Sequence, residues 1–241
     1  MSSLRVLSWN ILQGGGKRAD RIAEAIVVCE PDIAILQEYR NGNSASVILS
    51  GLEQIGLVHR HIPKATARKN CVLIASRYPI KISQWNDVLD PALAMTATID
   101  IDKFQLHIHA AHLPHKKPQI PYLEALLDMP IADNRNSIII GDLNCGIPFE
   151  DSETKTFDNT YLFQQLMKQG WVDTWRSRNL AVKEFSWVSN RGNGYRYDHC
   201  LCTTNIDQSI ANIAYDHGVR ELGISDHSAM ILNLNKLALI S

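Results

Sequence analysis

Polar and acidic side chains recur in this sequence at the points where apolar, strand-like segments begin or end. The positions are Asn10 after RVLSW, Glu38 after IAILQ, His112 after HIHAA, Asp142 and Asn144 after SIIIG, Asp198 in RYD, and Asp226 with His227 before SAMIL. A charged residue that closes a buried strand is costly unless it is exposed, paired or bound to a metal. Strand ends at one edge of a sheet are also where distant parts of a chain can meet. The pattern therefore predicts one site that combines carboxylates, amides and imidazoles.

Each of these residues also has a simpler interpretation when it is taken alone. Asn10 could be a turn residue, Glu38 an exposed strand end, Asp142 a cap or Asx-turn residue, and Asp226 an N-cap after Ser225. The same coincidence would have to recur at six strand ends, which favours a common site.

The elements that must position these residues follow from the hydrophobic pattern. Residues 4–11 predict a strand, Gly14 to Gly16 interrupt it, and a helix begins near Lys17 and ends before Pro31. Further strands are expected at 33–38, 71–76, 92–101, 104–111, 137–142, 186–190, 195–203 and 228–234. Helical faces are expected around Leu123, Leu126 and Leu127, and around Leu162 and Leu166. Short turns between many strands favour sheets that are largely antiparallel, with helices outside.

Composition limits the classes of protein to which the chain can belong. It has 241 residues, 45% hydrophobic content and a net charge of −1, so we expect one domain over residues 1–241 and only local contacts with nucleic acid. The five scattered cysteines are typical of reduced thiols in an intracellular protein. We find no signal segment and no apolar run of membrane length, which predicts a cytoplasmic chain without membrane insertion. We further expect a monomer with no obligate protein partner.

Seven segments in this order resemble the endonuclease/exonuclease/phosphatase superfamily. They are LSWNI with Asn10, LQE with Glu38, SRYPI after CVLIA, AAHLP with His112, GDLN with Asp142 and Asn144, RYDH with Asp198, and SDHS with Asp226 and His227. They extend over nearly the whole chain. The resemblance implies an α/β (α+β) fold, a four-layer sandwich of two mainly antiparallel β-sheets face to face with helices outside, and a site at one rim.

The resemblance also implies a metal-dependent phosphoesterase. A hard cation held by oxygen ligands, Mg²⁺ or Mn²⁺, would offset the negative charge of a phosphate ester. Glu38 is then the first choice for a direct metal ligand, while Asn10 and Asp226 hold the metal or its waters.

The remaining motif residues have catalytic roles in the family pattern. Asp142 holds or activates the attacking water, and Asn144 donates to a phosphate oxygen. His227 is expected to hydrogen-bond the phosphate and exchange a proton, with Asp198 fixing its tautomer. His112 would add a positive or donor group to the transition state.

The substrate is less determined than the reaction. The stretch from Trp171 to Arg176 and the segment FSWVSNRGNGYRYDHCLCT resemble the exonuclease III branch, and they add Trp187 and Arg196 as substrate-binding candidates. Trp171 and Trp175 are better interpreted as core aromatics. His112 departs from that branch, whose members have a tyrosine in this segment, and this puts abasic-site specificity in doubt.

Three functions therefore stay open. They are a nuclease that acts on DNA, a phosphodiesterase or phosphatase for a small-molecule or phospholipid or inositol-phosphate substrate, and a non-catalytic binding module on the same fold. Scattered basic residues, among them Arg18, Arg68 and Arg178, could form a rim for DNA but are more often solvated surface. His59, His61, His107 and His109 alternate as on a solvent-facing strand, and Arg77 is expected to be structural.

Overall fold

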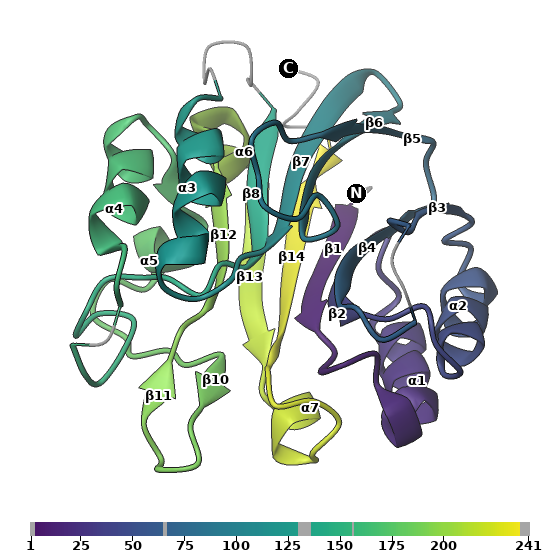
Figure 1. The fold of residues 1–241 in the computed structure, drawn as a ribbon. Helices are drawn as coiled ribbons and strands as arrows, with labels where there is room; N and C mark the ends of the chain where they lie inside the picture. Colours follow the sequence, from purple (N-terminus) through teal and green to yellow (C-terminus); the bar gives the residue numbers. More distant parts are fainter. Residues whose placement is uncertain (1–2, 65–66, 130–135, 156, 237–241) are drawn as a thin grey trace.

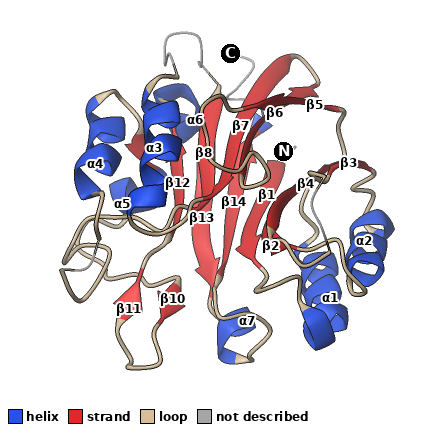
Figure 2. Cartoon of the chain, in the orientation of Figure 1, coloured by secondary structure: helices blue, strands red, loops and turns tan. Residues whose placement is uncertain are grey.

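Two six-stranded sheets lie face to face, and helices cover their outer surfaces (Figure 1, Figure 2). The computed structural model describes residues 3–64, 67–129, 136–155 and 157–236. The first sheet has the strand order β13-β14-β1-β2-β4-β3, and the second has the order β5-β6-β7-β8-β12-β9. The four-layer sandwich predicted from the sequence is therefore confirmed.

The first sheet and its helices come from both ends of the chain. Its strands are β1 (Ser3–Asn10), β2 (Ile33–Tyr39), β3 (His59–His61), β4 (Cys71–Ser76), β13 (Ile210–Asp216) and β14 (Ala229–Asn235). The 3₁₀ turn η1 (Gly16–Arg18) leads into α1 (Ala19–Cys29), and α2 (Ala45–Gln54) lies beside it. A short helix, α7 (Gly218–Glu221), precedes β14.

The second sheet is formed by the middle of the chain. Its strands are β5 (Ile80–Gln84), β6 (Ala94–Ile101), β7 (Phe104–His112), β8 (Ser137–Asp142), β9 (Val172–Asp173) and β12 (Asp198–Cys202). Its helical elements are η2 (Lys117–Gln119), α3 (Ile120–Leu127), α4 (Thr160–Lys168), α5 (Thr174–Arg178) and α6 (Thr204–Ser209). A small hairpin of β10 (Trp187–Val188) and β11 (Gly194–Tyr195) projects from the same end of the sandwich as α7 (Figure 1).

Strand directions bring the functional segments to one end. β1 pairs in parallel with β2 through α1, and β7 pairs in parallel with β8 through α3, while the other described pairings are antiparallel. Because parallel strands joined by a helix both end at the same edge, the carboxyl ends of these two pairs meet there. We call this end of the sandwich, from which α7 and the hairpin project, the rim.

The main apolar core lies between the two sheets. Val6 and Ile35 of the first sheet belong to the same buried cluster as Ile108 and Ile140 of the second. A second cluster lies under α1 and α2, and a third lies under α3 and α4. These cores hold the two sheets in fixed register, so side chains at the rim are positioned by rigid elements.

Several sequence-based expectations are corrected or refined by the structure. The segment expected as a strand over 195–203 forms a regular strand only from Asp198, and the segment 186–190 is reduced to the two residues of β10. The sequence did not indicate α2 or β13. The expectation that His109 faces solvent is wrong, because it is only 3% exposed beneath α3.

Other expectations are confirmed. Trp171 and Trp175 are buried, and Arg77 forms an ion pair with Asp32 (Nε to Oδ1, 3.0 Å). All cysteines lie within the described residues and are free thiols. Among the described helices, none combines the length and the apolar character needed to cross a membrane.

His109 makes the stability of the fold depend on pH. Burial lowers the pKa of His109 to about 3, and its Nδ1 contacts the Thr96 hydroxyl at 2.9 Å. The unfolded chain takes up a proton on this ring near its ordinary pKa of about 6.5, whereas the folded chain does not until much lower pH. This residue therefore removes stability as pH falls from about 6.5 toward 3.

We expect His109→Gln to weaken that pH dependence. Between pH 6 and pH 4 the free energy of unfolding of the variant should fall less steeply than that of the unsubstituted protein, by up to about 1.4 kcal/mol per pH unit. Urea titrations at a series of pH values measure the two slopes. Parallel curves for the two proteins would contradict the assignment of a neutral, buried imidazole.

Candidate functional site

A pocket of about 280 Å³ opens at the rim, and it gathers most of the residues that the sequence singled out. Its predicted members are Glu38, His112, Asp142, Asn144, Trp187, Asp226 and His227. Asn10 and Asp198 lie directly beneath these side chains and are buried. The predicted convergence in space is therefore observed for all candidates except Arg196.

The pairing of β8 with β12 and β7 sets the centre of the site. Asp142 is directly opposite Asp198 across the antiparallel β8–β12 pair, and directly opposite His112 across the parallel β7–β8 pair. Two carboxylates thus occupy facing positions on neighbouring strands, where like charges are unfavourable.

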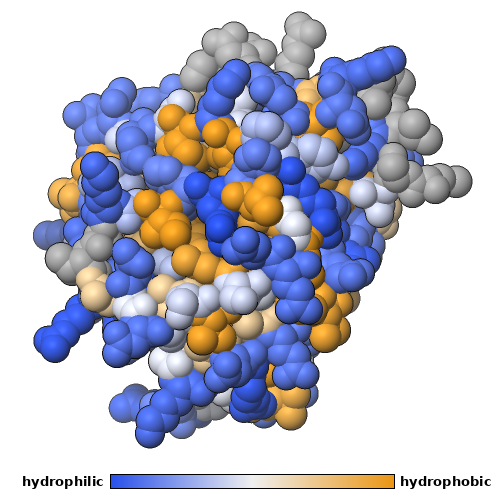
Figure 3. Space-filling view, turned by 90° about the vertical axis from the view of Figure 1, so that its right-hand side faces the viewer, coloured by the Kyte–Doolittle hydropathy of each residue, from blue (hydrophilic) through white to orange (hydrophobic). Residues whose placement is uncertain are grey.

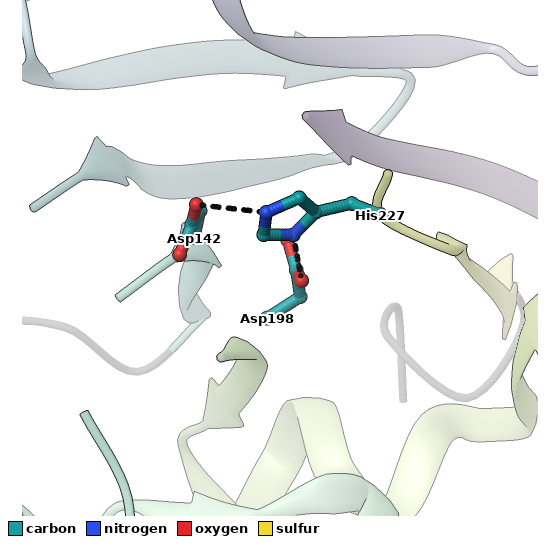
Figure 4. A group of neighbouring side chains, drawn as sticks. All are labelled: Asp142, Asp198 and His227. Atoms are coloured by element: carbon teal, nitrogen blue, oxygen red, sulfur yellow. Dashed lines mark hydrogen bonds and ion pairs between the residues drawn. The ribbon is translucent and has the colours of Figure 1, made fainter. Parts of the chain in front are cut away.

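His227, two residues before the start of β14, lies between these two carboxylates (Figure 4). Its Nδ1 hydrogen-bonds Asp198 Oδ2 at 2.8 Å, and its Nε2 lies 3.8 Å from Asp142 Oδ2. The Asp198 contact requires Nδ1 to carry the proton, which directs Nε2 toward Asp142 and the pocket. The contact between His227 and Asp198 is the one that the family resemblance implied, whereas the position of His227 next to Asp142 was not predicted.

Burial and charge shift the pKa values of all three groups. Desolvation raises the pKa of Asp142 to about 7, and the nearby Asp198 carboxylate adds to the rise. Desolvation opposes the charged form of His227, but Asp198 and Asp142 outweigh it and raise its pKa to about 10. Desolvation also acts on Asp198, yet the imidazolium of His227 lowers its pKa. Near neutral pH, Asp198 and His227 therefore form a charged pair, while Asp142 is close to its titration midpoint.

Asn10 links the two sheets at this point. Its Nδ2 donates to Asp142 Oδ2 at 2.9 Å and lies 3.4 Å from Glu38 Oε1. Glu38 has a left-handed backbone (φ 56°) where the β2–β4 register is interrupted, and its Oε2 accepts from the Gln13 amide at 2.8 Å. The irregularity places this carboxylate at the pocket rather than in the sheet.

His112 is held close to two carboxylates without a short contact to either. Its Nε2 lies 3.8 Å from Asp142 Oδ2 and 4.0 Å from Glu38 Oε1. Burial lowers the pKa of His112 to about 4, although Glu38 opposes the shift. At neutral pH His112 is therefore a neutral donor, which narrows the earlier expectation of a positive or donor group.

The opposite side of the pocket offers oxygen ligands that fit a hard cation. Trp187 Nε1 donates to Asp226 Oδ2 at 3.1 Å, which leaves the buried Asp226 Oδ1 without a partner. Glu38 lines the same pocket, and the charges of Asp226 and Glu38 both act on Arg18. Carboxylate and amide oxygens are the ligands that Mg²⁺ and Mn²⁺ prefer. Glu38, Asp226 and the Asn10 side chain thus suit such an ion chemically.

A second grouping also has ligand-like spacing. One atom each of Asp142, Asp198 and His227 lies within 4.8 Å of the others. However, His227 Nδ1 is already bonded to Asp198, so an ion between these two groups would have to displace a short hydrogen bond.

Arg196 does not reach the pocket, and the expectation that it binds substrate is wrong. It is fully buried, and its guanidinium is bonded to Asp151 and Asp173. A buried cation needs such partners, so the charge of Arg196 is used inside the protein.

Two pocket residues with polar side chains were missed by the sequence analysis, His115 and Tyr197. Tyr197 lies between Arg196 and Asp198 in the RYD segment, so its place in a motif was the available signal. His115 follows His112 by three residues, and nothing in its local pattern marks it. The ring of Tyr197 stacks on Tyr195 (centroids 5.1 Å apart, 8° between planes) and packs 5.6 Å from Trp187, which gives the pocket an aromatic wall.

Residues 7–227 match the Endonuclease/Exonuclease/phosphatase family. This match spans most of the chain and includes every residue of the pocket. The chain matches no sequence among the curated proteins at a significant level.

Solved structures with the same fold include endonucleases and an exonuclease. An AP endonuclease from Archaeoglobus fulgidus aligns with a TM-score of 0.80 and 18% identity over 95% of this chain and 98% of that one. A 3′–5′ exonuclease from Neisseria meningitidis aligns with a TM-score of 0.79 and 18% identity over 96% and 100%. The endonuclease domain of a telomere-specific non-LTR retrotransposon aligns with a TM-score of 0.70 and 18% identity over the full length of both chains. At these identities the likeness shows the fold.

The facing carboxylates predict a stability cost at the site. Because the folded-state pKa of Asp142 is raised to about 7, the folded chain holds a proton there that the unfolded chain has released, and stability falls as pH rises from about 4 to about 7. Asp142→Asn removes the ionisable group and should increase the free energy of unfolding at pH 8 by at least about 1 kcal/mol. Urea unfolding in the presence of a chelator measures this.

Asp100→Asn is the matched control, since Asp100 is an exposed carboxylate of β6. It should change the free energy of unfolding by no more than about 0.5 kcal/mol. A destabilised Asp142→Asn variant at pH 8 would show that the Asp142 carboxylate is a net stabilising group.

Proposed function

The chain belongs to the endonuclease/exonuclease/phosphatase family, and we propose that it is a divalent-metal-dependent phosphodiesterase that hydrolyses DNA. The observation that carries the proposal is the pocket lined by Glu38, Asp142 and His227, with the buried Asp198 bonded to His227 beneath it. Phosphoester hydrolysis needs an oriented water, a proton donor for phosphate oxygens and compensation for negative charge. The pocket has side chains for each requirement.

Asp142 is suited to hold the attacking water. Its raised pKa places it near neutral pH, where a carboxylate can accept a proton from water most effectively. Asn144 lines the same pocket, and its Nδ2 is fixed by a hydrogen bond to the Leu113 carbonyl at 2.8 Å. The second N–H of that amide is available to a phosphate oxygen.

His227 is suited to stabilise the charge that develops on the phosphate. As an imidazolium held by Asp198, it offers an Nε2–H donor whose direction is set before substrate binds. His112 offers a further donor from the neighbouring strand without adding charge. The short Asp198 contact keeps the imidazolium oriented, so that little reorganisation is needed during the reaction.

Glu38, Asp226 and Asn10 would hold the cation, with Glu38 as the direct ligand. When bound there, Mg²⁺ or Mn²⁺ polarises the phosphoryl oxygen and offsets the charge of the leaving oxygen. The indole N–H of Trp187 fixes the orientation of the Asp226 carboxylate, and the Trp187 ring forms part of the pocket wall. Trp187 thus contributes both to the cation side of the site and to contact with the group attached to the phosphate.

A basic groove beside the pocket favours DNA as the substrate. The groove, of about 660 Å³, is lined by Lys17, Arg40 and Arg68 among other residues. Gln13 lines it too and donates its backbone amide to Glu38, which joins the groove to the pocket. Cations spaced along a groove that leads to a phosphate-cleaving site suit a polyanionic backbone better than a single small ester. Figure 3 shows that this side of the molecule, which carries α1 and α2, combines hydrophilic residues with several hydrophobic patches near its centre.

The competing candidate is a phosphoesterase for a small substrate. The volume of the pocket is slightly below the range of about 300 to 1,000 Å³ that is typical of small-molecule sites. The wall of the pocket is not basic throughout, which favours a small ester over a polyanion. His112 also replaces the tyrosine of the repair branch. An assay panel separates the two functions.

We expect the purified protein with Mg²⁺ or Mn²⁺ to cleave plasmid DNA, an abasic duplex or both, in addition to a generic aryl phosphodiester. EDTA should abolish turnover, and Mg²⁺ should restore it. Asp142→Ala and His227→Ala should each reduce kcat by at least about 1,000-fold while circular dichroism shows a retained fold. Hydrolysis of the aryl ester with intact DNA would select the small-substrate function. Activity that survives exhaustive chelation would refute metal dependence.

The basic groove makes a separate prediction about affinity. Replacement of Lys17, Arg40 and Arg68 together by Gln should raise the Kd for DNA at least about tenfold, and the slope of log K against log salt should fall by about 0.9 for each phosphate that the variant no longer neutralises. Turnover of the aryl ester should not change, because the groove lies outside the pocket. Lys81→Gln, at an exposed position of β5, is the control. An unaltered salt slope in the triple variant would exclude the groove as a DNA-binding surface.

A further inference from the structure

Arg196, which does not reach the pocket, forms the centre of a buried ion cluster with Asp151, Asp173 and Arg176. Its Nη1 and Nη2 bond the two oxygens of Asp173 at 3.0 and 2.6 Å, and its Nε bonds Asp151 Oδ1 at 2.8 Å. Arg176 Nη2 also donates to Asp151 Oδ1 at 3.0 Å, and the Arg196 guanidinium lies 5.4 Å from the ring centre of Trp175. The two cations and two carboxylates balance in charge, which stabilises a cluster whose central members Arg196 and Asp151 are buried.

The cluster joins the two chain segments that carry the facing carboxylates. Arg196 lies two residues before Asp198. Asp151 closes the loop that follows Asp142, where its Oδ2 accepts from the Ile147 amide at 2.9 Å. The Arg196 amide also donates to the Asp151 carbonyl at 2.7 Å, so main chain and side chain both tie the loop to β12.

The contacts between Arg196 and Asp151 lie just beyond the point where the β8–β12 pairing ends. The last facing pair is Asp142 with Asp198, and only the bond from the Leu143 amide to the Tyr197 carbonyl (2.9 Å) extends the ladder beyond it. Two buried carboxylates at the end of a ladder repel each other and favour its opening. The ion cluster lies immediately beyond this end and opposes the opening.

We propose that Arg196 is a positioning residue that, through Asp151, holds Asp198 at the distance from Asp142 at which His227 can lie between them. The proposal rests on the function proposed above for its effect on turnover, but its geometric part does not. Asp173 fixes the position of the Arg196 guanidinium, and the guanidinium in turn holds Asp151 and the loop that connects it to Asp142. Loss of the Asp151 bond would let the ladder end separate and the His227–Asp198 hydrogen bond lengthen or break. Substrate and cation contacts at Glu38 belong to the other sheet and would remain.

Asp151→Asn tests this most directly, because it removes the charge that joins the loop to Arg196 and leaves the bidentate Arg196–Asp173 pair in place. Asp207→Asn is the matched control: it weakens another arginine–aspartate pair, Arg178 with Asp207 at 2.7 Å, which joins α5 to α6 and contacts no catalytic segment. Arg196→Lys serves as a second test variant. It keeps the positive charge but loses the planar guanidinium that bonds Asp173 and Asp151 at the same time.

We expect Asp151→Asn to lower kcat on the aryl phosphodiester by about 10- to 100-fold, because a shift of about 1 Å in a catalytic group has effects of this size. KM and the Kd for a non-hydrolysable DNA should stay within about twofold. The downfield proton resonance of the hydrogen-bonded His227 Nδ1–H should shift or disappear. Arg196→Lys should show the same changes to a smaller degree, and Asp207→Asn should show none of them.

The proposal is overturned if folded Asp151→Asn and Arg196→Lys keep both the resonance and kcat, or if Asp207→Asn loses kcat to the same extent. If Asp151→Asn does not fold, the resonance and kcat of Arg196→Lys decide. The resonance of the His227 Nδ1 proton can be measured in the absence of substrate, so it does not depend on the protein having activity. A protein that hydrolyses no phosphoester would therefore refute the proposed function while the resonance still decides whether the ion cluster positions Asp198.

Discussion

The site depends on one unfavourable constraint, which is that two carboxylates are paired across neighbouring strands inside the protein. Asp142 and Asp198 face each other in the β8–β12 ladder, and neither can move away without breaking the sheet. The imidazolium of His227 offsets the charge of both, which explains why its pKa is raised and that of Asp198 is lowered, although burial opposes both charged forms. Asp142 keeps a raised pKa because burial and Asp198 act on it in the same direction. The register of β8 with β12 thus explains both the raised pKa of Asp142 and the position of the His227 imidazolium beside two carboxylates.

Histidine shows how little the residue type alone determines. His109 and His227 are buried and His112 is partly buried, and in all three desolvation acts to lower the pKa. His227 alone among these three has a hydrogen-bonded carboxylate, and this reverses the sign of the shift. His112 has carboxylates at about 4 Å, which reduce the shift but do not reverse it. The difference between a neutral donor and an imidazolium is thus a difference in contact distance, which the sequence does not contain.

The residues of the pocket could be predicted from the sequence more completely than the buried contacts, the basic groove and the helix that surround them. Glu38 and Asp142 were recognisable because each closes an apolar strand, and the order of such strand ends carries the family pattern. Arg196 was assigned to substrate binding because an arginine in a motif resembles a ligand-binding residue, and only the tertiary partners Asp151 and Asp173 show that it is buried. Lys17 and Arg40 were not singled out, since the groove exists only after α1, α2 and the loop around Arg68 pack together. Local periodicity likewise missed α2, where small, polar and β-branched residues obscure the apolar face.

Both sheets are needed to assemble the site. The first contributes Glu38 and His227, the second contributes Asp142 and Asp198, and the hydrogen bond from Asn10 to Asp142 crosses between them. The His227–Asp198 bond crosses the same gap. The distances between the pocket side chains are therefore set by how the inner faces of the sheets pack, through core side chains such as Val6 and Ile140. Because packed interiors shift little, this arrangement holds the two repelling carboxylates in place, and part of the stability of the sandwich offsets their repulsion.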